Sequence, residues 1–149
     1  MAFVVDASAT LPWFLEDERT AFTDSLLGVI DRVEYWAPAV WCLEICNVLL
    51  IAERRRRIDH QRRLEALDQA SRLRIQIDAS VPDMKAISAL AARRSLSTYD
   101  AAYLELAMRF DFGLITLDRE LAEAALAEGV ALEAPGRSGA AQKRRRYNI

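Results

Sequence analysis

The chain has 149 residues, of which 52% are hydrophobic, with 5 Gly and 4 Pro. This composition predicts one domain with a sizeable core and excludes a disordered or fibrous chain. One His and two Cys are too few for a zinc site or a disulfide scaffold. No apolar run reaches the roughly 18 residues that a membrane span needs, and the N-terminus lacks a secretory pattern, so we expect a cytoplasmic protein with no membrane association.

The formal net charge of −2 hides an uneven distribution. Residues 137–149 carry five basic side chains and no acidic one, which predicts a basic flexible tail (136–149) after a single domain (1–135). A second basic stretch, residues 54–74, is rich in Arg. A basic stretch on an otherwise acidic domain is typical of a phosphate-binding surface, and a solvated helix face is the alternative for any single Arg.

Hydrophobic periodicity predicts strands that alternate with helices along the chain. Strands are expected at about 3–5, 34–37, 75–78, 113–116 and 130–132, and helices at about 9–15, 19–30, 38–56, 62–72, 82–94, 99–110 and 118–127. Ser8 is the expected N-cap of the first helix, Pro38 suits the first turn of the third, and Gly129 ends the last. The alternation predicts an α/β fold with a parallel sheet of four or five short strands and helices on both faces.

Three Asp residues stand at strand ends or helix starts. Asp6 ends the first strand, Asp118 follows the strand that ends at Thr116, and Asp100 opens a helix. Ligands of open parallel sheets bind at the carboxyl ends of the strands, so these side chains can converge there. The alternative for each Asp alone is a helix cap or a favourable charge at a helix N-terminus.

Glu44 lies inside an apolar helix, where an unpaired charge is costly to bury. It shares a helix face with Asn47, whereas Cys42 and Cys46 lie on roughly the opposite face, where we expect them to fill the core as inert thiols. The carboxylate needs a partner, which is either a metal ion or a nearby Arg. Clustered carboxylates suit Mg²⁺ or Mn²⁺, which prefer oxygen ligands. His60, the single His, is expected to be a solvated surface residue.

Four motifs in this order and spacing resemble those of the PIN-domain ribonucleases, and most closely the VapC toxins of bacterial type II toxin–antitoxin pairs. They are Asp6-Ala7-Ser8, Glu44 with Asn47, the block 97–103 (Ser-Thr-Tyr-Asp-Ala-Ala-Tyr), and Thr116-Leu117-Asp118. The resemblance covers about residues 2–133 and implies a Rossmann-like sheet. It assigns catalysis and metal binding to Asp6, Glu44, Asp100 and Asp118, and supporting polar roles to Ser8, Asn47, Ser97 and Thr116.

The resemblance also implies an activity and partners. The activity is cleavage of RNA phosphodiester bonds with Mg²⁺ or Mn²⁺, with transfer RNA or ribosomal RNA among the targets. The partners are a VapB-like antitoxin and a second copy of the chain in a homodimer. Arg54, Arg55, Arg62 and Arg63 are the expected contacts to the RNA backbone. The aromatic residues Trp13, Phe14 and Trp36 are candidates for part of the antitoxin groove, and core packing is the more common role for any one of them. The alternatives are a PIN-family nuclease of RNA maturation or DNA flap cleavage and a non-catalytic RNA-binding module.

Overall fold

The computed structural model describes residues 1–133 and has a four-stranded parallel sheet in the order β3-β2-β1-β4. The strands are β1 (Ala2–Val5), β2 (Glu34–Pro38), β3 (Ile75–Asp78) and β4 (Gly113–Ile115). β1 is nearly all apolar and pairs with β2 on one side and β4 on the other, as expected of a central strand with both faces covered. The α/β prediction is confirmed.

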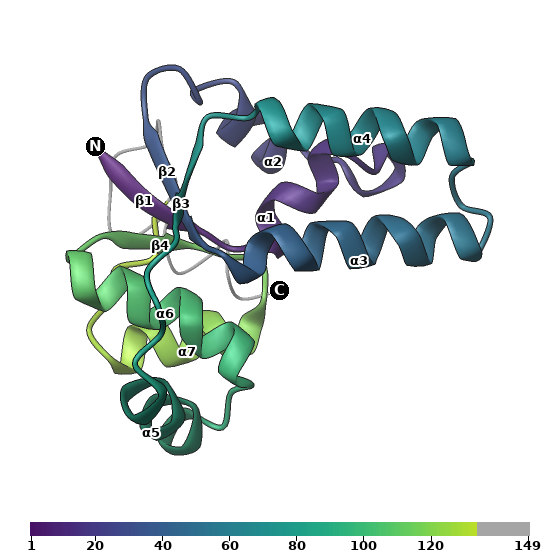
Figure 1. Ribbon diagram of the computed structural model, residues 1–149. Coiled ribbons are helices and arrows are strands. Elements are labelled where there is room, and N and C mark those ends of the chain that lie inside the picture. The colour runs from purple at the N-terminus through teal and green to yellow at the C-terminus, as the bar shows by residue number, and fades with distance from the viewer. Residues whose placement is uncertain (134–149) are drawn as a thin grey trace.

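The helices form two layers around this sheet (Figure 1). The helices α1 (Ala7–Thr10), α2 (Ala21–Leu27), α3 (Val40–Arg54) and α4 (His60–Arg72) lie on one side of it, and α5 (Met84–Arg94), α6 (Thr98–Phe110) and α7 (Arg119–Ala127) lie on the other. Two short 3₁₀ turns, Leu11–Trp13 and Glu16–Glu18, connect α1 to α2. α3 and α4 pack side by side as an antiparallel hairpin that projects from the sheet (Figure 1).

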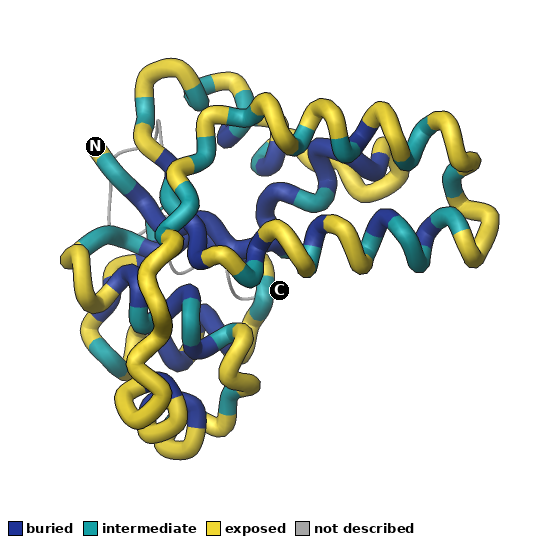
Figure 2. The backbone as a smooth tube through the Cα atoms, viewed as in Figure 1, coloured by how far each residue is buried: buried dark blue, intermediate teal, exposed yellow. Residues whose placement is uncertain are grey.

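The core lies where α6 crosses the sheet. α6 contacts β1, β2 and β4, and its buried face includes Tyr103, Leu104 and Leu106. In Figure 2 this centre is dark blue, whereas the end of the α3–α4 hairpin is mostly exposed. α4 buries only Ala66 fully, so it contributes little to the core and mainly covers α3. Within residues 1–133, no helix is long and apolar enough to cross a membrane.

Several local predictions were wrong. Pro38 is the last residue of β2 rather than the start of a helix, and α3 begins at Val40. Ser8 lies inside α1, where Asp6 occupies the N-cap position. The last predicted strand is reduced to a single bridge between Leu132 and Leu114. These segments are short, and the neighbouring strand decides where each element begins or ends. Gly129 does follow α7, with a φ of 78° that suits glycine.

The cysteine and aromatic predictions had mixed outcomes. Cys42 and Cys46 are both exposed on α3, so the prediction that they fill the core is wrong. Trp13 and Phe14 are buried in the core, which confirms the core-packing alternative for these two residues. Trp36 is partly buried and packs against Phe110 and Phe112. His60 is an exposed residue, as expected, beside Glu53.

Candidate active site

The candidate site lies at the carboxyl ends of β1 and β4. These strands are neighbours, yet the chain leaves β1 towards β2 and returns to β4 only after α6. Loops therefore diverge at this point of the sheet and leave room for a ligand. Asp6 follows β1 directly, and its backbone N–H donates to the Ile115 carbonyl at the end of β4, at 2.9 Å. The two strands thus place their following residues side by side.

Asp6 is a buried carboxylate held by two hydroxyls. Its Oδ2 accepts from the Ser8 hydroxyl at 2.6 Å and from the Thr116 hydroxyl at 2.8 Å. Burial raises the pKa of Asp6; the two hydroxyls oppose that shift, and repulsion from Asp100 and Asp118 adds to it. Ser8 and Thr116, predicted as supporting residues, therefore contact the buried carboxylate.

The same hydroxyls connect Asp6 to the loop after β4. The Leu117 N–H donates to the Ser8 hydroxyl at 2.9 Å, and the Asp118 N–H donates to the Thr116 hydroxyl at 3.0 Å. Asp118 is the N-cap of α7, because its Oδ1 accepts from the Leu121 N–H at 2.8 Å. For Asp118, the helix-cap alternative and the candidate site coexist: one carboxylate oxygen caps the helix while the side chain faces its acidic neighbours.

Asp100 stands in the first turn of α6 without capping that helix. Ser97 is the N-cap instead, and its hydroxyl accepts from the Asp100 N–H at 3.1 Å. Ser97 thus fixes the backbone that carries Asp100. Burial, followed by repulsion from Asp118, raises the pKa of Asp100, and Glu120 adds to the shift. Glu120, in the first turn of α7, is a further acidic neighbour that was not predicted.

Glu44 reaches the site from α3 on the other side of the sheet. It is half-buried, its Oε1 has no hydrogen-bond partner, and burial together with repulsion from Asp6 and Asp100 raises its pKa to about 7. No basic side chain contributes to this shift, so the alternative of a pair with Arg has no support within residues 1–133. Asn47, one turn further along α3, is exposed.

The donor set suits a hard divalent cation. Asp100 adds to the raised pKa of Asp6, both of these carboxylates add to the raised pKa of Glu44, and the Glu44 Oε1 has no hydrogen-bond partner within residues 1–133. A bound cation would relieve that repulsion. Nevertheless, no three acidic, His or Cys side chains of residues 1–133 are close enough together to enclose an ion directly. Mg²⁺ commonly keeps several waters and binds one or two carboxylates, which fits this looser arrangement.

Tyr103 is a site residue that the sequence prediction missed. It is fully buried on α6, one turn after Asp100, and its hydroxyl faces Glu44, Asp6 and the backbone of Ala7. The spacing of three residues from Asp100 is the signal that could have found it, because residues three apart share a helix face. Burial, and then the charges of Asp6 and Glu44, raise its pKa far above the ordinary value.

The predicted RNA-binding residues fall into two groups. Arg54 and Arg55 are exposed at the end of the α3–α4 hairpin, and neither forms an ion pair with another residue of the described part of the chain, 1–133. Arg62 donates to the Phe14 carbonyl at 3.0 Å, and Arg63 is paired with Glu53. The next free cation in sequence is Arg56, which has a φ of 59° in the turn between the helices.

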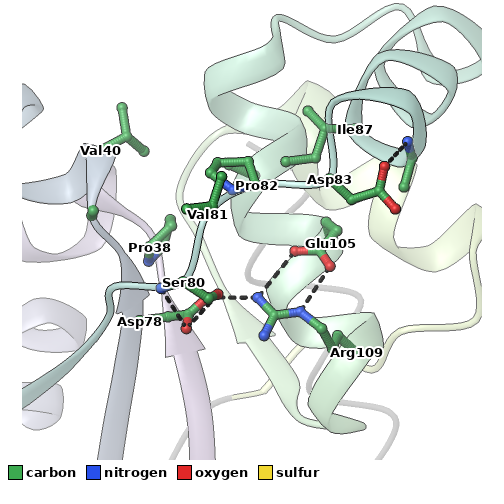
Figure 3. Close-up of a pocket in the computed structure, with 13 residues that line it drawn as sticks. Pro38, Val40, Asp78, Ser80, Val81, Pro82, Asp83, Ile87, Glu105 and Arg109 are labelled. Carbon is green, nitrogen blue, oxygen red and sulfur yellow. Dashed lines mark hydrogen bonds and ion pairs between the residues drawn. The ribbon is translucent and has the colours of Figure 1, made fainter.

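A separate hollow of about 440 Å³ lies between the start of α3, the loop after β3, α5 and α6. Figure 3 shows its polar wall, where Arg109 donates to Asp78 at 2.6 Å and to Glu105 at 2.8 Å. Both carboxylates therefore hold the guanidinium in place. This Arg is engaged and offers no free cation to a phosphate.

Comparison with known proteins agrees with this geometry. The model of the PIN domain family matches residues 3–126, most of the chain. The chain belongs to the PIN-domain family. Among curated proteins, it is 32% identical over 126 residues to the ribonuclease VapC3 of Pyrobaculum aerophilum, covering 83% of this chain and 94% of that protein.

Solved structures show the same fold. The protein PAE2754 from Pyrobaculum aerophilum matches with a TM-score of 0.62 and 25% identity, over 83% of this chain and 79% of that chain. A chain of the VapBC2 complex from Rickettsia felis, solved bound to a promoter DNA fragment, matches with a TM-score of 0.64 and 12% identity, over 89% of this chain and 98% of that chain. The resemblance to PIN domains drawn from the four motifs is thereby confirmed.

Proposed function

We propose that this PIN domain is a Mg²⁺- or Mn²⁺-dependent endoribonuclease and the toxin of a VapBC-type toxin–antitoxin pair. The observation that carries the proposal is the convergence of Asp6, Glu44, Asp100 and Asp118 at the ends of β1 and β4 without a neutralising basic side chain among residues 1–133. The similarity to the ribonuclease VapC3 supports the substrate class.

The chemistry follows from what these side chains can hold. A divalent ion bound here would stabilise charge on the phosphoryl oxygens and lower the pKa of a bound water. Asp6 is the most firmly placed ligand, since two hydroxyls fix it. Asp100 and Asp118 would bind the ion directly or through water, and Glu44 would complete the site and orient the attacking water.

The RNA backbone is proposed to lie along the α3–α4 hairpin. Arg54, Arg55 and Arg56 are unpaired cations at its end, and Arg54 is ten residues beyond Glu44 on α3, or about 15 Å along the helix axis. Backbone contacts of this kind give affinity without choosing a sequence. Arg62 and Arg63 are proposed to shape the hairpin and contribute less to binding, because protein groups already occupy them.

The proposed protein partners are an antitoxin and a second copy of the chain. For the homodimer we assign an exposed apolar face that runs from α3 to the start of α5. Leu43, Val81 and Met84 are 70%, 91% and 82% exposed there. Val40, on the same helix as Leu43, lines an apolar hollow together with Met84, so the face is continuous. An exposed apolar face of this kind marks a protein contact.

The decisive experiment is RNA cleavage by the purified chain with Mg²⁺ or Mn²⁺ and with EDTA. Cleavage is expected only with the metal, and Asp6→Asn should abolish it. RNA binding without cleavage under every condition would favour the RNA-binding module. Co-expression with the neighbouring upstream gene should relieve toxicity and give a co-purifying complex; a harmless chain with no such partner would favour a nuclease of RNA maturation.

A further inference from the structure

Two buried polar atoms in the acidic site have no hydrogen-bond partner. They are Oε1 of Glu44 and the hydroxyl of Tyr103, and they belong to neighbouring side chains on α3 and α6. A buried polar atom without a partner is uncommon, because water satisfied it in the unfolded chain. One of these atoms belongs to a hydroxyl that can donate and the other to a carboxylate that can accept, so the two neighbouring side chains can satisfy each other.

The Tyr103 hydroxyl is suited to donate and unsuited to ionise. It faces the carboxylates of Asp6 and Glu44, and a tyrosine hydroxyl keeps its proton at neutral pH. Its ring is fully buried, which fixes the direction of the hydroxyl. Tyr103 is therefore a rigid neutral donor at the floor of the acidic site.

Glu44 has no other donor of this kind. The Ser8 and Thr116 hydroxyls both donate to Asp6, and the Ser97 hydroxyl is engaged with the backbone of Asp100. Tyr103 is the neighbouring hydroxyl that lowers the pKa of the Glu44 carboxylate, against the effect of burial. Without it, a carboxylate on α3 would be free to turn towards solvent and away from Asp6.

We propose that Tyr103 is a positioning residue for Glu44. The Tyr103 hydroxyl holds the Glu44 carboxylate towards Asp6 and thereby completes the metal site. The inference rests on the proposed function, because the arrangement matters only if the carboxylates hold an ion. Outer partners that orient a metal ligand typically alter metal affinity or activity by about 10- to 100-fold when they are removed.

The test is Tyr103→Phe with Tyr35→Phe as the matched control. Tyr35 is also fully buried, but its hydroxyl donates to the Leu26 carbonyl at 2.9 Å, away from the acidic site. Mn²⁺ affinity is measured by calorimetry, and kcat and KM are measured on one RNA. Tyr103→Phe should weaken Mn²⁺ binding and lower kcat by about 10-fold or more with KM unchanged. Tyr35→Phe should leave all three unchanged.

A double-mutant cycle in EDTA tests the pair without metal. Melting temperatures are compared for the wild type, Tyr103→Phe, Glu44→Ala and the double variant. Coupled side chains give non-additive shifts, here expected to differ by about 3 °C or more from additivity. The same cycle on Mn²⁺ affinity should show that Tyr103→Phe has no further effect once Glu44 is removed.

The outcomes separate the two proposals. A wild type that binds no Mn²⁺ and cuts no RNA overturns the proposed function, and this inference with it. If the wild type binds Mn²⁺ and cuts RNA, and Tyr103→Phe does both equally well, the inference alone is overturned. Additive melting-temperature shifts in the double-mutant cycle overturn it as well. If Tyr103→Phe fails to fold, Glu44→Asp withdraws the carboxylate from the hydroxyl instead, and an unweakened Mn²⁺ affinity in that variant overturns the inference.

Discussion

Asp6 shows how one residue serves both fold and chemistry. Its backbone joins β1 to β4, and its side chain is buried against the hydroxyls of Ser8 and Thr116. Those two hydroxyls lower the free energy of the charged form, whereas burial and the neighbouring carboxylates raise it. The balance leaves a carboxylate that is held in place but electrostatically unfavourable until a cation arrives.

Asp6→Asn should therefore separate stability from activity. In EDTA the variant is expected to melt at the same temperature as the wild type or a few degrees higher, because an amide removes the repulsion from Asp100 and Asp118. Added Mn²⁺ should raise the melting temperature of the wild type by mass action and that of the variant much less. A strong loss of stability in EDTA would show that the Asp6 carboxylate is structural and not a metal ligand.

Glu44 predicts a pH dependence of the metal-free protein. Its pKa is about 7 in the fold against an ordinary value of 4.5, so the folded state binds its proton more tightly than the unfolded state does. The free energy of unfolding should therefore fall as the pH rises from about 4.5 to about 7. Glu44→Gln should remove the part of this decrease that comes from Glu44. A smaller decrease should remain, because the pKa values of Asp6 and Asp100 are also raised.

Urea unfolding in EDTA across that pH range measures the effect. Because Glu44 is half-exposed, the change in the free energy of unfolding should be smaller than the roughly 1.4 kcal/mol per pKa unit of a fully buried group. Identical pH profiles for the wild type and Glu44→Gln would contradict the assignment of the shift to Glu44.

In the proposed function, the α3–α4 hairpin links the acidic site to the RNA. The helix α3 carries Glu44 near the sheet, and the end of the hairpin carries Arg54, Arg55 and Arg56. Other basic side chains of the hairpin are neutralised: Arg57 pairs with Asp17 at 2.9 Å and with Glu18 at 3.0 Å. These exposed pairs tie the hairpin to the 3₁₀ turn before α2 and leave its end as the free positive surface.

Reversal of charge at the hairpin end should weaken RNA binding. Arg54→Glu with Arg55→Glu is expected to lower affinity for every RNA and to flatten the salt dependence, by about 0.7 units of log–log slope for each lost phosphate contact. Arg72→Glu with Arg119→Glu is the control, since both of those residues are exposed and paired within their own helices. Affinity is measured in the Asp6→Asn background, so that cleavage does not interfere.

The basic tail is the competing anchor for RNA. The predicted tail, residues 136–149, lies outside the described residues, and the domain boundary at 135 stays a prediction. Deletion of the tail should leave the salt dependence nearly unchanged if the hairpin carries the RNA. If deletion of the tail flattens the salt dependence and the Arg54→Glu, Arg55→Glu variant keeps it, the contacts to the RNA backbone belong to the tail instead.

At the scale of the whole molecule, the two layers of helices differ in how completely they are covered. α6 is enclosed by the sheet, α5 and α7, whereas α3 has Leu43, Cys46 and Asn47 exposed on its outer face. Val81 and Met84 extend this face at the start of α5. The exposed thiol of Cys46 is three residues after Leu43, on the same side of α3.

If the proposed homodimer forms through this face, substitutions on the face should change the oligomeric state. Leu43→Glu with Met84→Glu should convert a dimer into a monomer in light scattering, because each charge would be buried against an apolar partner. Leu126→Glu is the control, since Leu126 is a similarly exposed apolar residue on α7, outside this face. Thiol labelling of Cys46 should become faster in the monomeric variant. A wild type that is monomeric at high concentration would contradict the assignment.

The sequence by itself determined the class of fold and the identities of the acidic residues. Alternating strand and helix periods require a parallel sheet, and the carboxyl ends of parallel strands gather Asp6 and Asp118. The apolar periods of strands and helices are local patterns, so they can be recognised in a single sequence. The same applies to Ser97, whose capping role depends on residues only three positions away.

Only the tertiary structure decided which surfaces are covered and which charges are free. A helical period shows that Cys42 and Cys46 share a face, but whether another element packs on that face depends on the whole topology. Likewise, Arg57 meets Asp17 across 40 positions of sequence, whereas Arg54 meets no partner. Tyr103 belongs to the site for the same reason: α6 and α3 approach from opposite sides of the sheet, and only their packing brings its hydroxyl to Glu44.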